Sequence, residues 1–596
     1  MNPITLQLIP EPREVVLLKN STRRIRMHFI LSCENFIVAK LFNERLEKLL
    51  GFSLQNMPEN PKAKITFAYQ DGLEKEEYIL RIENTITLFA STHIGMLYGA
   101  YTLLQLIDST QNNIPYVEIK DCPAFVERGY YHDITRGKMP TMQSLKELID
   151  TAAYYKYNQF QFYIEHCFAF EGLEQVWFDK CPLQANDVIE LQSYAQERGI
   201  DLIPSITTFG HMYEILRTQK HKDLCERNNP DTAPYSFVHR MGSHTINPFH
   251  EEAFALVCKM IDQYLPLFHS QYFNICCDET FDLCCEKNKD SVPTPEHRYQ
   301  VYCDFSKRIA NYVKGKGKTV MMWDDILLRG DFQQMPNDIV YLDWDYSAEP
   351  SEENRKAIAQ KPHVQVCAGT SSWNRLLPNY DVMFKNSDAL SRLAMKYGIQ
   401  GYCLTCWGDF GDILKHKLQH LSIAYNGAVA WEGRGRENKE EFLEHFGWFH
   451  YKDKQLPGIL LDIAEYQIVN WHELVLSLDK DVVQKPAYQE HIKKLCQEQE
   501  KLDYAKLSVL EEILYSKLVC AHDRSFILEM LTLCQGVRAF NLFDLQNYTY
   551  HGSFDKLCKF WHKYCEQHRA YNQEAELSRA TEVIRALMLA YTSEEK

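Results

Sequence analysis

The stretch Tyr272-Phe-Asn-Ile-Cys-Cys-Asp-Glu-Thr280 decides how this sequence is interpreted. Its apolar part predicts a short buried strand, 272–276, which ends in two adjacent carboxylates, Asp278 and Glu279. In a closed parallel barrel, residues at the carboxyl ends of the strands face the substrate, so carboxylates at that place are catalytic candidates. A solvated helix start after an apolar run produces the same pair, and the surrounding chain has to decide between the two interpretations.

Strand-like and helix-like segments alternate between residues 125 and 435. Short apolar runs predict eight strands, at 129–133, 159–164, 201–205, 272–276, 319–323, 339–343, 364–368 and 401–405. Helical spacing lies between them, at 144–155, 187–198, 251–268, 299–313 and 387–397. Such alternation predicts parallel strands with crossover helices, and eight repeats predict an α/β fold built on a (β/α)8 TIM barrel.

The segments on either side of this barrel differ from it in pattern. Residues 1–124 predict a small α+β domain, with strands at 4–9, 64–68, 78–82 and 85–89 and a helix at 91–107. Gly95 and Gly99 weaken that helix, so we expect them to permit close packing against the sheet. Residues 436–596 predict an all-helical domain, with helical spacing at 489–515, 524–540 and 573–591. This domain either packs on the barrel or forms a homodimer.

Charge and cysteine content narrow the function classes. The formal net charge of −15 argues against a nucleic-acid partner, and no run approaches the about 20 apolar residues of a membrane span. The 19 cysteines are an odd number in a large chain, which favours a reducing compartment, and we expect a cytoplasmic protein. Cys403-Leu-Thr-Cys406 has the spacing of zinc ligands but no second pair, so we expect neither a metal nor a cofactor.

Polar and aromatic residues collect where the predicted strands end. A lone buried histidine or tryptophan is more often a core residue than a ligand, but here every strand end carries such a group. Besides Asp278 and Glu279, the candidates are Arg128, Glu165, His211, Trp323, Asp325, Trp344, Tyr346, Trp373, Trp407 and Asp409. Acids beside tryptophans, without a phosphate-binding glycine loop, predict a sugar pocket, where rings stack on C–H faces and carboxylates bind hydroxyls.

Several of these segments resemble the β-N-acetylhexosaminidases of glycoside hydrolase family 20. The similar segments are Glu127-Arg-Gly-Tyr-Tyr-His-Asp133, Ile203 to His211, Asn274-Ile-Cys-Cys-Asp-Glu279 and Trp407-Gly-Asp409, and the helix at 91–107 looks like the one that closes the family's small domain. The chain departs from the family at Cys276 and Cys277, where two glycines are normal, and at Asp409, where glutamate is normal. Tyr163-Ile-Glu165 and Trp344-Asp-Tyr346 look more like the intracellular hexosaminidase D branch.

The resemblance implies an exo-acting retaining hydrolase for terminal β-linked N-acetylglucosamine or N-acetylgalactosamine. Glu279 would be the general acid and base, and Asp278 would orient the 2-acetamido group, which attacks the anomeric carbon to form an oxazolinium intermediate. Arg128 would bind hydroxyls of the terminal sugar, and His211 would lie beside the acid. Tyr346 is our candidate for holding the acetamido oxygen, because Asn374 follows Trp373 where the family's tyrosine is expected.

Two other functions stay open at this point. A retaining glycosidase could use Glu165 or Asp325 as a covalent nucleophile, and it would act on sugars without an acetamido group. A non-catalytic carbohydrate-binding barrel is the other alternative, although the acid pair argues against it. The sequence does not distinguish gluco from galacto substrates.

Overall fold

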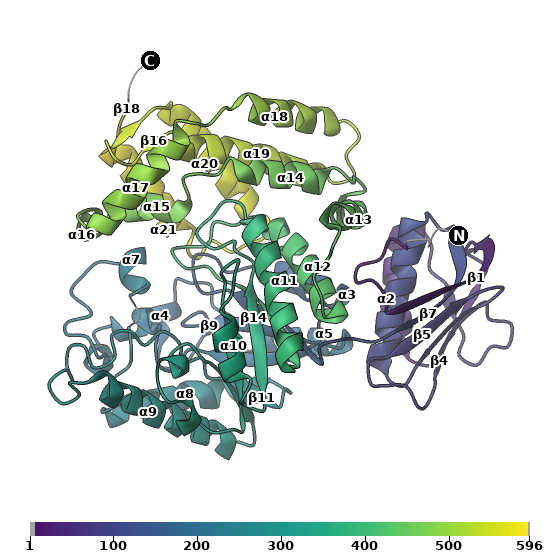
Figure 1. The fold of residues 1–596 in the computed structure, drawn as a ribbon, viewed down its shortest axis with the longest axis horizontal. Coiled ribbons are helices and arrows are strands. Elements are labelled where there is room, and N and C mark those ends of the chain that lie inside the picture. Colours follow the sequence, from purple (N-terminus) through teal and green to yellow (C-terminus); the bar gives the residue numbers. More distant parts are fainter. Residues whose placement is uncertain (1–5, 243, 594–596) are drawn as a thin grey trace.

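A computed structural model describes residues 6–242 and 244–593 of the chain. Three parts follow one another along the sequence: a sheet domain at the amino end, a central barrel, and a mainly helical carboxyl part. In Figure 1 the carboxyl part lies above the barrel and the sheet domain lies to the right.

The central part is a closed barrel of eight parallel strands, in the order β10-β11-β12-β13-β14-β15-β8-β9. The strands are β8 (Glu127–Asp133), β9 (Gln159–Ile164), β10 (Asp201–Ile206), β11 (Tyr272–Asn274), β12 (Thr319–Trp323), β13 (Ile339–Trp344), β14 (Val364–Gly369) and β15 (Gly401–Cys406). All eight predicted strands are present, with bounds within two residues of those expected. The TIM barrel predicted from the alternating pattern is therefore confirmed.

Helices after the strands cover the outside of the barrel. The main ones are α3 (Met142–Tyr154), α5 (Ala185–Glu197), α8 (Glu251–Tyr264), α9 (Pro295–Gly315), α10 (Glu352–Ile358), α11 (Tyr380–Tyr397) and α12 (Gln419–Glu432). Because β8 pairs with β15, the first and last strands of the barrel are neighbours, and the helices that follow them, α3 and α12, pack against each other.

The two cysteines with zinc-like spacing, Cys403 and Cys406, point to opposite sides of β15. Cys403 packs among the residues that fill the barrel, close to Gly129, whereas Cys406 belongs to the core outside it. Positions three apart on a strand point to opposite faces, so these thiols cannot bind the same metal ion.

The amino-terminal domain is a seven-stranded mixed sheet with two helices. Its strand order is β1-β7-β5-β6-β4-β2-β3, made of β1 (Glu14–Arg23), β2 (Ile30–Cys33), β3 (Gln55–Asn56), β4 (Ile65–Tyr69), β5 (Tyr78–Ile82), β6 (Ile86–Ala90) and β7 (Ile114–Asp121). The helices are α1 (Phe36–Leu50) and α2 (His93–Ser109). A Cβ atom on Gly99 would meet Leu88 at 2.2 Å, so this glycine permits α2 to lie directly on the sheet, as expected.

The strand predicted at 4–9 is wrong over its described part. Residues 6–9 form no strand, and the side-chain amide of Gln105 takes the place of a sheet partner: it accepts from the Ile9 N–H at 2.8 Å and donates to the Ile9 carbonyl at 2.6 Å. Residues 4 and 5 lie outside the described residues.

The carboxyl part contains nine helices within the described residues. They are α13 (Lys439–Tyr451), α14 (Leu456–Glu465), α15 (Trp471–Ser477), α16 (Lys480–Val483), α17 (Pro486–Gln499), α18 (Ala505–Lys517), α19 (Arg524–Asn541), α20 (Phe554–His568) and α21 (Leu577–Ala590). A sheet of three two-residue strands, β16 (Phe543–Asp544), β17 (Thr549–Tyr550) and β18 (Thr592–Ser593), adds to the predicted helices. No helix in the described ranges is long and apolar enough to cross a membrane.

Candidate active site

A pocket lies at the carboxyl end of the barrel strands. Its lining comes from the ends of, or the loops after, seven of the eight strands: Arg136, His211, Met241, Asp278, Glu279, Trp323, Trp344, Tyr346, Trp373, Trp407 and Asp409. Nine of these were predicted from the sequence, whereas Arg136 and Met241 were not. The strand ends thus bring together groups from residues far apart in the chain, as a barrel site requires.

Aromatic rings form the walls of this pocket. Trp344 and Tyr346 stack with centroids 5.0 Å apart, and Tyr346 lies at the same distance from Trp373. Trp407 packs 5.6 Å from Trp323, and its indole N–H donates to the Tyr346 hydroxyl at 2.8 Å. A Cβ atom on Gly369 would meet both Trp373 and Tyr346 within 2.8 Å, so a glycine is needed where these rings close the pocket.

The acid pair follows β11 on a strained backbone. Cys276, Cys277 and Glu279 have φ values of 57°, 65° and 49°, a region that favours glycine. The two cysteines stand where the family that the sequence resembles has two glycines, so the unusual backbone is present without the usual residue. Strain of this kind, of order 1–3 kcal/mol per residue, is found mostly at functional sites.

His211 lies between the two carboxylates. Its Nε2 atom is 3.4 Å from Oδ2 of Asp278 and 3.2 Å from Oε2 of Glu279. Burial and the Arg136 guanidinium oppose a charge on this imidazole, but Asp278 and Glu279 outweigh them and raise the pKa of His211 to about 10. We therefore expect an imidazolium at neutral pH.

The two oxygens of Asp278 differ in their surroundings. Oδ2 faces His211, whereas Oδ1 is buried and has no hydrogen-bond partner among the residues that the structure describes. A buried carboxylate oxygen without a donor is costly unless a ligand supplies one. Asp278 as a residue lines the pocket, so a rotation of its carboxylate would bring this oxygen to an N–H or O–H group of a bound molecule.

Asp325 is hydrogen-bonded to the backbone of the acid pair. Its Oδ2 atom accepts the backbone N–H of Glu279 at 3.3 Å. Burial, followed by the charges of Asp278 and Glu279, raises the pKa of Asp325 to about 7. It does not line the pocket, so it positions Glu279 rather than meeting a ligand.

The arginine in the pocket is Arg136. Its Nε donates to Oε1 of Glu165 at 2.8 Å, Nη2 donates to the Tyr163 hydroxyl at 3.1 Å, and Nη1 lies 3.4 Å from Oδ1 of Asp409. Burial, together with nearby Asp133 and Glu279, outweighs Arg136 and raises the pKa of Asp409 to about 6. Glu165 is buried behind Arg136 and does not line the pocket.

The prediction that Arg128 faces the sugar is wrong. Arg128 lies at the amino end of β8, where Nη1 donates to the Phe125 carbonyl and Nε to the Lys156 carbonyl, each at 2.8 Å. Its Nη2 donates to Glu76 of the amino-terminal domain. Arg128 therefore joins two domains at the end of the barrel opposite the pocket. The only sequence signal for Arg136 was its place, three residues beyond the strand that ends at Asp133.

The carboxyl part of the chain holds two loops of the pocket. The backbone N–H of Trp471 donates to the Asn374 carbonyl at 3.0 Å, and its indole N–H donates to the Phe410 carbonyl at 3.1 Å. The Arg240 guanidinium donates to the Asp409 carbonyl. Its Nη1 atom lies 3.8 Å from Oε2 of Glu576, the residue that precedes α21. These contacts fix the positions of Trp373 and Asp409, a role that sequence reasoning missed.

Two family models match the chain. The model of the glycosyl hydrolase family 20 catalytic domain matches residues 179–374, and that of domain 2 of the same family matches residues 5–122. The chain belongs to glycosyl hydrolase family 20. Its catalytic match contains the acid pair, His211 and three of the four pocket tryptophans.

Individual relatives are distant. A β-hexosaminidase of Porphyromonas gingivalis is 26% identical over 343 residues, which is 49% of this chain and 42% of the relative. Hexosaminidase D of Bos taurus is 25% identical over 238 residues, 38% of this chain and 65% of the relative. The chain thus spans about half the length of these curated relatives. A solved structure of a chitobiase from Flavobacterium johnsoniae covers 97% of this chain and 99% of its own, with a TM-score of 0.61 at 17% identity, which supports the fold.

Proposed function

We propose that this family 20 member is an exo-acting, retaining β-N-acetylhexosaminidase that removes terminal β-linked N-acetylglucosamine or N-acetylgalactosamine from glycans. The observation that carries the proposal is the unpartnered Oδ1 atom of Asp278 in a pocket walled by tryptophans. An acetamido N–H is a donor of the right kind for that oxygen. The catalytic-domain match and the hexosaminidase names of the relatives support the same activity.

In the first step, Asp278 accepts the N–H of the substrate's 2-acetamido group. This hydrogen bond turns the acetamido carbonyl oxygen towards the anomeric carbon, where a new C–O bond forms as the glycosidic C–O bond breaks. Glu279 gives its proton to the departing oxygen. The resulting oxazolinium ion is positive, and the Asp278 carboxylate stabilises it.

In the second step, water attacks the anomeric carbon from the face that the leaving group vacated. Glu279, now a carboxylate, takes a proton from this water, and the bond to the acetamido oxygen breaks. Two displacements at the same carbon leave the sugar in its original β configuration. No protein nucleophile is needed, which is why the two acids can be neighbours in the sequence.

Tyr346 is our proposed partner for the acetamido oxygen. Its hydroxyl accepts from the Trp407 indole and has Thr405 as a further polar neighbour, and we propose that its O–H turns to the acetamido oxygen when substrate binds. Burial raises the pKa of Tyr346 well above its ordinary value, which keeps it protonated. Arg136 and Asp409, which lie together in the lining, are the proposed partners for the sugar hydroxyls.

Paired chromogenic substrates test the proposal. We expect hydrolysis of 4-nitrophenyl β-N-acetylglucosaminide or β-N-acetylgalactosaminide, or both, and none of the matching β-glucoside. Asp278→Asn should lower kcat by about 10²-fold or more while substrate still binds, because the loss falls on the transition state. Equal turnover of the glucoside, or wild-type kcat in Asp278→Asn, would overturn the proposal.

A glycosidase with a carboxylate nucleophile is the second candidate, and the geometry disfavours it. Glu165 is buried behind Arg136 and Tyr163, and Asp325 lies beneath the acid pair. Neither lines the pocket, so neither reaches an anomeric carbon bound there. A non-catalytic binding barrel is disfavoured because the acid pair and its histidine are assembled.

We propose a reducing compartment, the cytoplasm, as the site of action. All 19 cysteines are free, including the neighbours Cys276 and Cys277. The test is to isolate the protein under anaerobic conditions without reductant, denature it and titrate its thiols. A count of 19 thiols supports the proposal, and a lower count contradicts it. The homodimer stays a prediction, which light scattering on the purified chain tests.

A further inference from the structure

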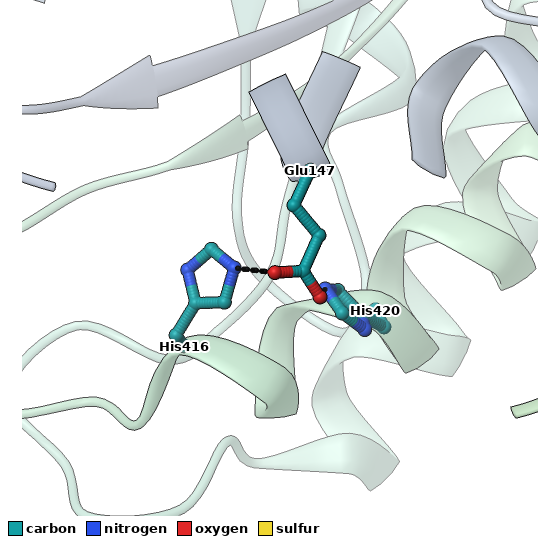
Figure 2. A group of neighbouring side chains, drawn as sticks. All are labelled: Glu147, His416 and His420. Atoms are coloured by element: carbon teal, nitrogen blue, oxygen red, sulfur yellow. Dashed lines mark ion pairs between the residues drawn. The ribbon is translucent and has the colours of Figure 1, made fainter. Parts of the chain in front are cut away.

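Two buried histidines and a glutamate meet on the outside of the barrel, away from the pocket. His416 begins the 3-10 turn His416–Leu418, His420 lies one helical turn later on α12, and Glu147 lies on α3. Because residues four apart in a helix share a face, both imidazoles point towards the same carboxylate (Figure 2). The cluster therefore joins the helices that follow the first and last strands of the barrel.

The contacts in this cluster are ion pairs that are longer than ordinary hydrogen bonds. Nε2 of His416 is 3.5 Å from Oε2 of Glu147, and Nε2 of His420 is 3.8 Å from Oε1 (Figure 2). Hydrogen bonds between nitrogen and oxygen are about 2.7–3.2 Å long. Both Nε2 atoms are buried and without a hydrogen-bond partner in the described part of the chain, although both histidines are at least nine-tenths buried.

The same distances suit ligands of one metal ion. Zinc binds histidine and carboxylate ligands at about 2.0–2.2 Å in a tetrahedron, which places neighbouring ligand atoms about 3.4 Å apart. One ligand atom from each of the three residues lies within 4.8 Å of the others. Small movements of two side chains would therefore place a tetrahedral ion at bonding distance from all three.

We propose that Glu147, His416 and His420 form a binding site for a divalent transition-metal ion, with zinc the best match. Two imidazoles and one carboxylate are a ligand set that zinc favours, and water completes the tetrahedron from the side where Glu147 is 37% exposed. The role is structural, because the ion connects α3 to α12 and lies under Tyr571, which stacks on His416 at 5.0 Å. The ion would thereby connect the helices after the first and last barrel strands to each other and to Tyr571 of the carboxyl part.

A second histidine pair provides a matched control. His472 and His491 each lie 3.3 Å from Glu473, but that carboxylate already accepts the Asn470 N–H at 2.9 Å, and His491 is 51% exposed. The geometry points to no metal there. His491→Asn thus tests whether any metal found is only loosely held by surface histidines.

The experiment uses the full chain, stripped with a chelator, incubated with zinc chloride, desalted and analysed by elemental mass spectrometry. We expect one zinc ion per wild-type or His491→Asn chain, and less than about one tenth of an ion in the double variant His416→Asn/His420→Asn. Glu147→Gln, a conservative change at a partly exposed position, should bind zinc at least about tenfold more weakly and guards against a misfolded double variant.

Thermal melting gives a second readout. Zinc should raise the melting temperature of the stripped wild-type chain and leave that of the double variant unchanged, because only a folded site gains from the ion. The proposal is overturned if the wild type retains no stoichiometric zinc, if the double variant or Glu147→Gln binds zinc as the wild type does, or if His491→Asn alone removes it.

Discussion

Nε2 of His211 lies 3.2 Å from Oε2 of Glu279. The same nitrogen is 3.4 Å from Asp278, so a single imidazolium touches both acids of the pair. With its pKa raised to about 10, His211 supplies a positive charge that holds the Asp278 carboxylate in place and leaves its second oxygen for the substrate. His211 thus contacts both acids, while one oxygen of Asp278 has no hydrogen-bond partner among the described residues.

Glu279→Gln should lower kcat by about 10²–10⁴-fold on an unactivated disaccharide, because glutamine cannot transfer a proton. The loss should be smaller on a 2,4-dinitrophenyl glycoside, whose leaving group needs no protonation in the first step. Steady-state rates on the two substrates check this. Glu296→Gln, a change of an exposed acid at the start of α9, serves as the control and should retain full activity. Equal losses on both substrates would argue against a general acid at 279.

Arg136→Lys should impair catalysis, whereas Arg128→Lys should impair stability. Lysine cannot keep the contacts of Arg136 with Glu165 and Asp409, so we expect kcat/KM to fall by about 10–100-fold. Arg128→Lys should lower the free energy of unfolding by about 1–3 kcal/mol, with kcat and KM kept, because its partners lie at the far end of the barrel. Steady-state kinetics and thermal melting of both variants show which arginine acts in catalysis and which in stability. A raised KM in Arg128→Lys with normal stability would restore the original expectation.

Asp325→Asn should stabilise the protein at alkaline pH. The folded-state pKa of Asp325 is raised from 3.8 to about 7, so the folded protein binds a proton that the unfolded chain has lost between these values. The stability that this proton provides is complete below about pH 4 and is lost as the pH rises through 7. Asparagine removes this dependence, and the variant should gain on the order of 2–4 kcal/mol over wild type at pH 8 and nothing at pH 4. Melting curves across this range measure the difference.

Asp345→Asn is the control of opposite sign. Burial of Asp345 is outweighed by hydrogen bonds from Ser347 and Ser351 and by the charge of Arg355, which lower its pKa. The carboxylate therefore stabilises the fold at neutral pH, and this stability is lost as the pH falls through the folded-state pKa. The variant should be less stable than wild type at pH 8 and closer to it in acid. The interpretation of Asp325 fails if both variants shift in the same direction at pH 8.

Glu576→Gln should affect the pocket from the carboxyl domain. Glu576 lies 3.8 Å from Arg240, which holds the carbonyl of Asp409, so its loss should let that loop move and raise KM by about 3–30-fold. Glu574→Gln is the matched control, because in the described part of the chain the Glu574 side chain forms an exposed ion pair with Arg569, and such pairs contribute little. Unchanged KM in both variants would show that Glu576 has no positioning role.

The barrel was predictable because each strand is a short apolar run with clear ends. The acid pair was predictable because it follows such a run directly. The arginine was assigned wrongly although the same rule applies to it: Arg128 lies at the amino end of β8, and Arg136 lies three residues beyond its carboxyl end, which is the end that faces the pocket.

Other errors have equally local causes. β1 (Glu14–Arg23) was missed because it pairs with β7 while almost all of its residues are exposed, so it carries no apolar alternation. The predicted helix at 489–515 is two helices, α17 and α18, and the break between them was missed because it contains no glycine or proline. The supports from Trp471 and Glu576 depend on contacts between parts distant in the chain, for which the sequence has no periodic signal.

The most direct test of the central claim is a series of aryl β-N-acetylglucosaminides whose acetyl group carries no, one, two or three fluorine atoms. Fluorine withdraws electrons from the acetamido carbonyl oxygen and weakens it as a nucleophile, while a protein nucleophile would be unaffected. If the substrate's own oxygen attacks, as we propose, kcat/KM should fall steeply with each fluorine. A rate that is independent of fluorination would contradict the account.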